Sequence, residues 1–332
     1  LRLESGVKKK IIVCGFGFMG QTHAANILNS SDLELAAVVT FESKDSIKPV
    51  AGNISTGNFD WKLLDDIPFF TTLAEAFANC ECDAVVIASP TAAHASSAIE
   101  CLNAGKHVFL EKPLCVTANE AKDILAAAEK SNCIFHVGHC LRFFPQYSYL
   151  KQVVSENTYG KLKYLKLLRR AGVPVWGAWK DKDTSLKSIT GPIYDLNIHD
   201  VDFALYLAGE PENLSAVKEA YADKLFKAEW KTACGTLIEI EGGFSDQPAF
   251  PFRSGYTAVF ENATLECATN AQTPVQLSCG EKCEPVELPD QDGYALEMRA
   301  FADALAGKNT AHCTPAEAAR ALAVCASIVD AI

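Results

Sequence analysis

The residues best suited to proton transfer lie between Gly191 and Asp202. If this stretch is helical from about residue 192, Asp195 and His199 are four residues apart and share one face of the helix. A carboxylate beside an imidazole is a workable general acid/base unit, because histidine changes its charge near neutral pH. The alternative is that His199 is a core histidine with satisfied hydrogen bonds and that the aspartates form a helix surface.

A second candidate is Lys112, in the tripeptide Glu111-Lys112-Pro113 at the end of an expected strand. Open parallel sheets bind ligands at the carboxyl ends of their strands, so a lysine placed there would point into the ligand crevice. Pro113 can adopt a cis peptide bond and so aim the lysine. The alternative is a solvated lysine before a proline turn.

Two further groups of residues lie where a ligand could reach them. The first group follows another expected strand and comprises Ser89, Pro90, Thr91 and His94. It could equally be a proline turn whose threonine caps the next helix. The second group comprises Arg169, Arg170, Trp176 and Trp179. Aromatic rings beside cations suit a sugar-like ligand or a nicotinamide ring, but exposed tryptophans also suit a subunit contact.

A glycine pattern, Gly15-x-Gly17-x-x-Gly20, indicates the fold that would position these groups. An apolar run from Ile11 to Cys14 precedes it and a helical pattern follows it, which is the order that a dinucleotide-binding turn requires. Gly15 allows the tight turn, Gly17 allows a pyrophosphate to approach the backbone, and Gly20 allows the helix to pack closely. The N–H groups and the positive dipole end of that helix would then face the phosphates.

Strands and helices alternate along the first part of the chain, which predicts a doubly wound parallel sheet. Strands are expected at 10–14, 33–41, 83–89, 107–110 and 133–137, and helices at 19–30, 73–77, 92–104 and 117–131. Gly105 is expected to cap one helix, and Thr117 with Glu120 forms a capping box for the next. Residues 49–70 are expected to form a long loop.

After about residue 140 the pattern changes to longer strands, several of them alternating in polarity. Strands at 162–170, 234–244, 256–267 and 275–279 predict a large, mainly antiparallel sheet with one covered face, and helices are expected at 193–208, 294–306 and 315–331. We therefore expect an α/β chain with a Rossmann domain at 1–140 and an α+β domain at 141–332. The helices in 294–332 could pack back on the first domain.

Composition limits the partners of this 332-residue chain. A formal net charge of −11 argues against nucleic acids and anionic membrane surfaces. No apolar run approaches the roughly 20 residues that span a bilayer. Thirteen cysteines, an odd number scattered through expected strands and helices, favour buried free thiols in a reducing, cytoplasmic compartment. Their spacing is not that of a zinc site, so no metal is expected.

Together and in this order, the motifs resemble the glucose–fructose oxidoreductase / inositol dehydrogenase / rhizopine catabolism (Gfo/Idh/MocA) family. The resemblance covers residues 15–211 and rests on Gly15-x-Gly17-x-x-Gly20, Ser89-Pro90-Thr91-x-x-His94, Glu111-Lys112-Pro113, Val137-Gly138-x-x-x-Arg142-Phe143 and Gly191…Asp195…His199. It implies a Rossmann domain followed by a domain whose open sheet often forms homodimers or homotetramers. It also implies NAD(P)-dependent oxidation or reduction of a sugar, an inositol-like polyol or a related hydroxy or carbonyl compound.

The resemblance also implies roles for individual residues. Lys112 would contact the nicotinamide and the substrate, Asp195 would bind the substrate hydroxyl, and His199 would be the general acid/base. The implied cofactor-binding residues are Gly15, Phe16, Gly17, Phe18, Met19, Gly20, Thr40, Glu42, Lys44, Ser89, Pro90, Thr91, His94, Glu111 and Lys112. The residues expected to bind the substrate, from the resemblance together with the residue types, are Lys112, Arg142, Arg170, Trp176, Trp179, Asp195 and His199.

One position departs from the usual pattern of NAD-binding domains, in which an acidic residue ends the second strand and holds the ribose hydroxyls. Here Thr40 occupies that position and Glu42 comes two residues later. Thr40, Ser43 and Lys44 could instead accommodate a 2′-phosphate, which slightly favours NADP over NAD. If the end of the strand is shifted, Glu42 could still bind the ribose of NAD.

Two other functions stay open. The protein could be an NAD-dependent glycosidase or an epimerase-type enzyme that oxidises a sugar transiently. It could also be a catalytically silent protein that binds and senses NAD(P), although the presence of Lys112, Asp195 and His199 counts against this.

Overall fold

The computed structural model describes residues 8–48, 61–175, 181–269, 275–308, 310 and 312–332. The chain divides into two compact units. Unit 1 consists of residues 1–139 and 292–319, and unit 2 of residues 140–291 and 320–332.

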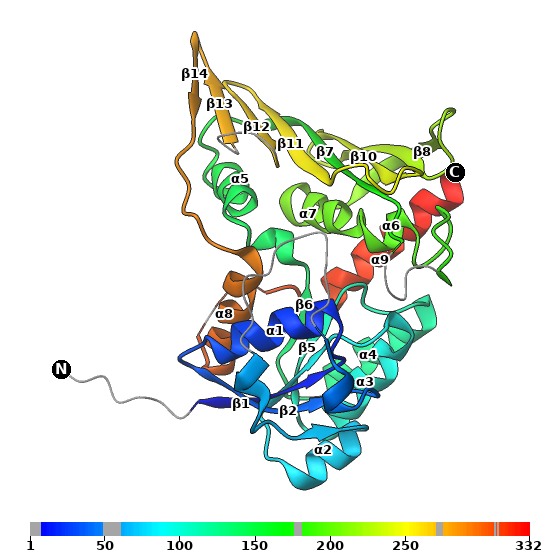
Figure 1. The fold of residues 1–332 in the computed structure, drawn as a ribbon. Helices are drawn as coiled ribbons and strands as arrows, with labels where there is room; N and C mark the ends of the chain where they lie inside the picture. Colours follow the sequence, from blue (N-terminus) through cyan, green and yellow to red (C-terminus); the bar gives the residue numbers. More distant parts are fainter. Residues whose placement is uncertain (1–7, 49–60, 176–180, 270–274, 309, 311) are drawn as a thin grey trace, which may run out of the picture. The chain divides into compact units, whose positions relative to one another are not determined.

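Unit 1 is built on a six-stranded sheet, sheet A, with the strand order β3-β2-β1-β4-β5-β6 (Figure 1). Its strands are β1 (Lys9–Cys14), β2 (Leu33–Val39), β3 (Phe69–Phe70), β4 (Ala84–Ile87), β5 (His107–Glu111) and β6 (Phe135–Gly138). Its helices include α1 (Phe18–Leu28), α2 (Leu73–Asn79), α3 (His94–Asn103), α4 (Ala118–Lys130) and α8 (Gly293–Leu305). All pairings are parallel, and the order is that of a dinucleotide-binding sheet, which confirms the predicted Rossmann fold.

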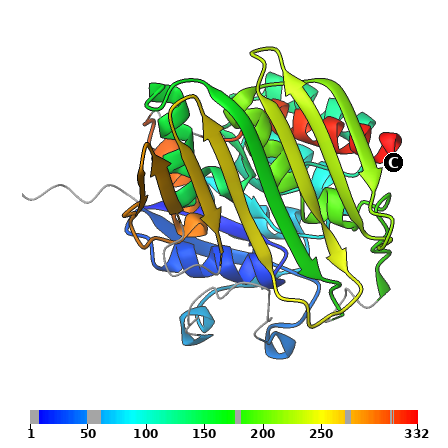
Figure 2. The ribbon, with the colours of Figure 1, turned by 90° about the horizontal axis from the view of Figure 1, so that it is seen from above.

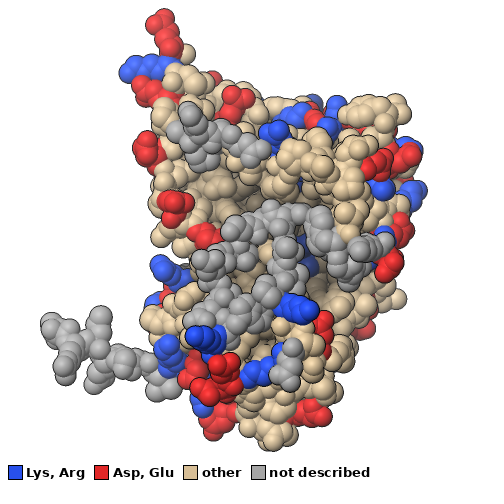
Figure 3. Space-filling view, viewed as in Figure 1, with Lys and Arg blue, Asp and Glu red and all other residues tan. Residues whose placement is uncertain are grey.

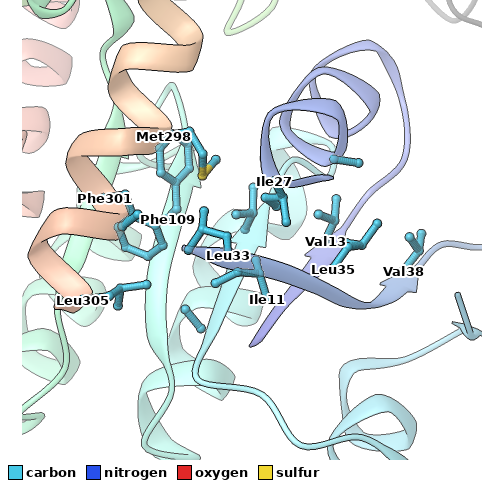
Figure 4. Packing of buried hydrophobic residues seen from close by; sticks show 14 of the residues in the cluster. Ile11, Val13, Ile27, Leu33, Leu35, Val38, Phe109, Met298, Phe301 and Leu305 are labelled. Atoms are coloured by element: carbon cyan, nitrogen blue, oxygen red, sulfur yellow. The ribbon is translucent and has the colours of Figure 1, made fainter. Parts of the chain in front are cut away.

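The strands of sheet A are continuous apolar runs because both faces of the sheet are buried. Successive residues of a strand point to opposite faces, and Ile11, Ile12 and Val13 are all 0 % exposed. Figure 4 shows one of these faces, where α1 and α8 pack on β1, β2 and β5. The ring of Phe301 on α8 meets Phe109 on β5 edge to face, with 5.6 Å between the ring centroids. Helix α8, although distant along the chain, thus completes the core of unit 1.

The predicted helix ends in unit 1 are confirmed. Thr117 and Glu120 form the complete capping box of α4, and Gly105 follows α3 with a left-handed φ of 68°. The loop predicted at 49–70 is wrong at its end, because Phe69 and Phe70 form β3 and pair with the end of β2. This strand has only two residues, too few to show a pattern.

Unit 2 contains an eight-stranded sheet, sheet B, with the order β14-β13-β12-β11-β7-β10-β9-β8 (Figure 2). Its strands are β7 (Leu162–Gly172), β8 (Pro211–Lys218), β9 (Leu225–Thr232), β10 (Leu237–Ser245), β11 (Arg253–Phe260), β12 (Thr264–Ala268), β13 (Val275–Cys279) and β14 (Lys282–Pro285). Only the pairing of β7 with β10 is parallel among these described strands, which confirms the predicted mainly antiparallel sheet.

Helices α5 (Pro145–Glu156), α6 (Pro192–Asp195) and α7 (Ile198–Ala208) lie along one face of sheet B (Figure 1). Helix α9 (Pro315–Ala331) begins in unit 1, and its residues from Arg320 onward belong to unit 2. In β9 the side chains of Phe226, Ala228 and Trp230 are buried, whereas those between them are exposed. Sheet B therefore has one covered face and one open face, and Figure 2 views the open one.

The strand prediction in unit 2 misses β8, β9 and β14 and is wrong at one further place. The stretch 256–267, predicted as a single strand, is the hairpin of β11 and β12. The turn is closed by a 2.8 Å hydrogen bond from the Phe260 N–H to the Ala263 carbonyl. This turn contains neither glycine nor proline, and its one turn-favouring residue, Asn262, is a weaker signal that the prediction overlooked.

No helix in the described part of the chain is long and apolar enough to cross a membrane.

All thirteen cysteines are free thiols, but Cys234, Cys279 and Cys283 are exposed, so the prediction of buried thiols is wrong for these three. Acidic and basic side chains are interspersed on the face seen in Figure 3.

Candidate active site

The glycine turn connects β1 to α1 in unit 1. Gly15 has a φ of 90°, and a Cβ atom there would lie 2.5 Å from the backbone of Ala88. A Cβ atom at Gly20 would collide with the carbonyl oxygen of Gly15, so α1 sits directly on the turn. At Gly17, by contrast, a Cβ atom would meet nothing within 4 Å. The turn is therefore closely packed against the protein at Gly15 and Gly20 and open at Gly17, the position that must admit a pyrophosphate.

The other residues of this segment divide between the core and the helix start. The Phe16 side chain is buried and packs edge to face on Phe69, so only its backbone is placed to line the turn. Phe18 and Met19 are the first residues of α1 and are partly exposed. The backbone N–H groups of this first turn supply the anion-binding capacity of a helix N-terminus.

Two further groups of predicted residues follow β4 and β5, which run parallel to β1. Ser89, Pro90 and Thr91 come directly after β4, where the Ala88 N–H donates to the Cys14 carbonyl at 2.7 Å. Lys112 follows β5, and its bond to Pro113 is cis, as predicted. The carboxyl ends of parallel strands share one edge, so sheet A brings these residues to the edge that carries the glycine turn.

His94, a predicted cofactor-binding residue, is 1 % exposed and engaged within the protein. Its Nδ1 lies 2.8 Å from the Pro113 carbonyl oxygen and its Nε2 lies 3.0 Å from the Ser89 carbonyl oxygen. Burial lowers the pKa of His94, although the two carbonyl contacts oppose this shift. The ring therefore bridges the segments that follow β4 and β5.

Glu111, also predicted to bind the cofactor, is buried against a histidine that the sequence analysis missed. One carboxylate oxygen lies 2.6 Å from Nε2 of His23 on α1, and the other accepts a 3.2 Å hydrogen bond from the Lys112 N–H. Burial alone would raise the pKa of Glu111, but the hydrogen bond and charge of His23 lower it below the usual range. A histidine on an apolar helix carries no sequence signal of its partner, so only the fold identifies this pair.

The end of β2 carries the predicted ribose-binding residues. The strand ends at Val39, whose carbonyl accepts from the Gly15 N–H at 2.8 Å, so Thr40 lies beside the glycine turn. Glu42 is exposed, and its backbone N–H donates to the Thr40 hydroxyl at 3.4 Å. The Lys44 ammonium donates to the carbonyls of Asp65 and Ile67.

The two residues of the proposed acid/base pair lie in unit 2, on consecutive short helices. Asp195 is the last residue of α6, and His199 is in the first turn of α7. The prediction of one continuous helix is wrong, because the chain departs from α6 at Leu196 and Asn197. The Asn197 side chain donates to the Arg169 carbonyl at 3.2 Å and packs where a Cβ atom at Gly242 would stand. Sheet B thus sets the break between the two helices.

The start of α7 is fastened to β7 by a buried ion pair. Asp200, next to His199, is 0 % exposed and accepts hydrogen bonds from the Arg169 guanidinium at 2.9 and 3.1 Å. Burial alone would lower the pKa of Arg169, but the negative charge of Asp200 raises it. The Cys140 sulfur lies 3.9 Å from Nδ1 of the His199 ring.

The predicted substrate-binding arginines occupy different surroundings. Arg142 is buried and forms a bidentate pair with Asp202 of α7, with contacts of 2.9 and 2.6 Å. Arg170 pairs with Glu241 of β10 at 2.7 Å. Since neighbouring strand residues alternate, Arg170 is on the face of sheet B opposite to Arg169 and α7, and the structure does not bring it to His199. Trp176 and Trp179 lie outside the described residues.

Comparison with known proteins matches both parts of the chain to one family. The model of the oxidoreductase family with an NAD-binding Rossmann fold matches residues 9–139, and the model of the Gfo/Idh/MocA C-terminal domain matches residues 147–268. The UDP-N-acetylglucosamine 3-dehydrogenase of Acidithiobacillus ferrooxidans is 28 % identical over 330 residues, which are 96 % of each protein. Its solved structure has a TM-score of 0.78 at 23 % identity and covers 98 % of both chains.

A second relative is the myo-inositol 2-dehydrogenase of Thermotoga maritima. It is 29 % identical over 217 residues, which are 64 % of this chain and 58 % of that relative. The two family models agree with the strand order of sheet A and with the glycine turn, and together they identify the family of the chain. The chain belongs to the Gfo/Idh/MocA family of NAD(P)-binding oxidoreductases.

Proposed function

We propose that the protein is an NAD(P)-dependent dehydrogenase that oxidises a secondary hydroxyl group of a sugar or polyol, or reduces the corresponding carbonyl. The observation that carries this proposal is the carboxyl edge of sheet A, where the glycine turn open at Gly17 and Lys112 lie together. The substrate class is supported by the relatives, which are named as dehydrogenases of a nucleotide sugar and of myo-inositol.

The proposed reaction assigns one task to each candidate residue. A nicotinamide cofactor held by the glycine turn and the start of α1 would supply the hydride acceptor for the substrate carbon. His199 removes the hydroxyl proton, and Asp195 accepts a hydrogen bond from the substrate. The ammonium group of Lys112 stabilises the negative charge that develops on the substrate oxygen. Trp176 and Trp179 remain proposed sugar contacts. Arg142 acts through its pair with Asp202, which holds the turn Cys140–Arg142, just before α5, against α7.

The experiment that tests this function combines cofactor binding with a substrate panel. Purified protein is titrated with NADH and NADPH and then assayed with inositols, aldoses and nucleotide sugars in the presence of each oxidised cofactor. Net reduction of added cofactor supports a dehydrogenase. Turnover without net reduction, on cofactor that copurifies with the protein, would support the glycosidase or epimerase alternative. Binding without any turnover would support the sensing alternative.

For the cofactor itself we propose a preference for NADP. No carboxylate ends β2, and Thr40 and Ser43 offer hydroxyl groups to a 2′-phosphate. Lys44 offers a positive charge, although its ammonium already donates to the carbonyls of Asp65 and Ile67. We expect Thr40→Asp to lower kcat/KM for NADP and to raise it for NAD, shifting their ratio by roughly 10-fold or more, because a carboxylate binds the ribose hydroxyls and repels the phosphate. Steady-state kinetics with both cofactors provides the ratio. Thr72→Asp, at an exposed threonine that precedes α2, is the control, and an unchanged ratio in Thr40→Asp would contradict the proposed role.

We further propose that the protein forms a homodimer or homotetramer through the open face of sheet B and works in the reducing cytoplasm. The open face carries an ion-pair network in which Lys166 contacts Glu239 and Glu241. The thirteen free thiols favour a reducing compartment. Light scattering under reducing conditions measures the molar mass, and a monomer at all concentrations would contradict the oligomer.

A further inference from the structure

We propose that His23, Glu111 and His94 are positioning residues that hold the Lys112–Pro113 dipeptide from both sides and thereby fix where the Lys112 ammonium group can reach. We call these three residues the lysine clamp. The inference rests on the proposed function, in which Lys112 contacts the nicotinamide and the substrate. Glu111 and His94, which the motifs predict as cofactor-binding residues, would act instead through the backbone of Lys112 and Pro113.

The first side of the clamp acts on the backbone of Lys112. Glu111 is the last residue of β5, and its carboxylate accepts from the Lys112 N–H at 3.2 Å. The other oxygen lies 2.6 Å from Nε2 of His23, which is 0 % exposed. His23 belongs to α1, the helix that also supports the glycine turn. The same helix therefore supports the cofactor turn and orients the carboxylate that holds Lys112.

The charge state and the packing of Glu111 both favour this arrangement. His23 keeps the pKa of the Glu111 carboxyl below its usual range in spite of burial, so the carboxylate is ionised at neutral pH. Hydrogen bonds to an ionised acceptor are stronger than those between neutral groups. A Cβ atom at Gly138 on β6 would lie 3.3 Å from the carboxylate. The backbone of β6 therefore packs closely against the Glu111 carboxylate and restricts its alternative rotamers.

The second side of the clamp acts on the carbonyl of Pro113. Nδ1 of His94 lies 2.8 Å from this oxygen, and Nε2 lies 3.0 Å from the carbonyl of Ser89 after β4. His94 begins α3 and is 1 % exposed. A neutral imidazole donates to one of these two carbonyls, and the buried ring fills the space between the backbone that follows Lys112 and the neighbouring strand end. Lys112 and Pro113 are held at the N–H of the first and the C=O of the second.

A clamp on the backbone matters because lysine carries its charge on a long, flexible stem. The reach of the ammonium group depends on where the stem begins, and a misplacement of about 1 Å at a reacting centre can cost about 10²-fold in rate. If the clamp positions Lys112, removing it should lower kcat far more than it weakens cofactor binding. If the three residues only satisfy one another's hydrogen bonds in the core, removing them should lower the free energy of unfolding and leave kcat unchanged.

The test measures how far bound cofactor shields the Lys112 amine from a reagent, which depends on where the ammonium group lies. The amino groups of the full-length protein are modified with trinitrobenzenesulfonate, with and without NADH or NADPH, and the extent of modification at Lys112 is quantified by mass spectrometry. Lys122, exposed on α4, is the internal reference. The variants are His23→Ala, His23→Gln, Glu111→Gln and, as the matched control, His136→Gln. His136, like His23, is 0 % exposed and contacts the ring of Phe109, and its carboxylate partner is Glu297 of α8.

In the wild type and in His136→Gln, we expect bound cofactor to protect Lys112. In His23→Ala and Glu111→Gln, we expect this protection to be largely lost and kcat for the best substrate of the panel to fall by about 10²-fold, with cofactor Kd within about 3-fold of wild type. The amide of His23→Gln can still donate to Glu111, so this variant should keep most of the protection of Lys112 and most of the wild-type kcat. The His23→Gln and Glu111→Gln pair keeps the test decisive if His23→Ala fails to fold.

Two outcomes would overturn the proposal, and they differ. If His23→Ala and Glu111→Gln fold and keep both the protection of Lys112 and the wild-type kcat, the clamp has no positioning role although the proposed function stands. If cofactor binds to the wild type without protecting Lys112, the placement of Lys112 in the proposed function is itself wrong, and the clamp proposal falls with it.

Discussion

Replacing His199 with alanine will lower kcat by about 10²–10⁴-fold, the usual contribution of a general acid/base, and will leave cofactor affinity nearly unchanged. The reason is that His199 lies in unit 2, whereas the glycine turn and the ends of β2, β4 and β5 lie in unit 1. Steady-state kinetics gives kcat, and fluorescence titration with NADH and NADPH gives Kd. A loss of cofactor affinity equal to the loss of kcat would show a structural effect in place of a catalytic one.

The control for this prediction is His312→Ala. His312 is exposed and follows α8, so its removal takes away one imidazole without touching α6, α7 or the glycine turn. We expect His312→Ala to retain wild-type kcat. Full activity in His199→Ala would mean that another group takes the substrate proton, and the proposed acid/base role would be wrong.

Replacing Asp200 with alanine will lower the free energy of unfolding by about 3–5 kcal/mol, because the buried guanidinium of Arg169 is then left without its carboxylate. Asn197 loses its 3.2 Å hydrogen bond to Asp200 in the same variant. Both losses fall on the segment that carries His199, so kcat should decline as well. Urea unfolding followed by tryptophan fluorescence measures the change, with Trp230 buried in β9 as a reporter in unit 2.

The matched control is Lys163→Ala, on the same strand as Arg169 but at an exposed ion pair with Glu261. Solvent screens such a pair, so its removal should change the unfolding free energy little. Asp200→Asn should lie between the two, since it keeps a hydrogen-bond acceptor but removes the charge. An Asp200→Ala variant as stable as Lys163→Ala would show that the Arg169–Asp200 pair does not hold α7 on sheet B.

The sequence predicts the Rossmann part of the fold well because its signals are local. Each central strand of sheet A is a short apolar run, and the helix ends carry their own caps at Gly105 and Thr117. The break between α6 and α7 has no local signal, since residues 192–202 suit a single helix. It depends on Asn197, which bonds to Arg169 and packs against Gly242 from strands distant in sequence.

The same distinction explains the candidate site. The glycine turn and Lys112 were identified because a motif and a strand end define them. His23 and the roles of Glu111 and His94 were not, because a buried histidine is recognised only by the partners that the fold brings to it. The placement of Arg170 could have been foreseen, since two adjacent residues of a strand face opposite sides of the sheet and cannot both reach the same helix.

The most direct test of the proposed function follows a deuterium atom. The sugar or polyol accepted in the panel is prepared with deuterium on the carbon that bears the oxidised hydroxyl, and the reduced cofactor is analysed by mass spectrometry after turnover. We predict that the deuterium appears on the nicotinamide ring and that the product accumulates in equal amount to the reduced cofactor. A product that forms while the cofactor stays unlabelled and oxidised would contradict a dehydrogenase.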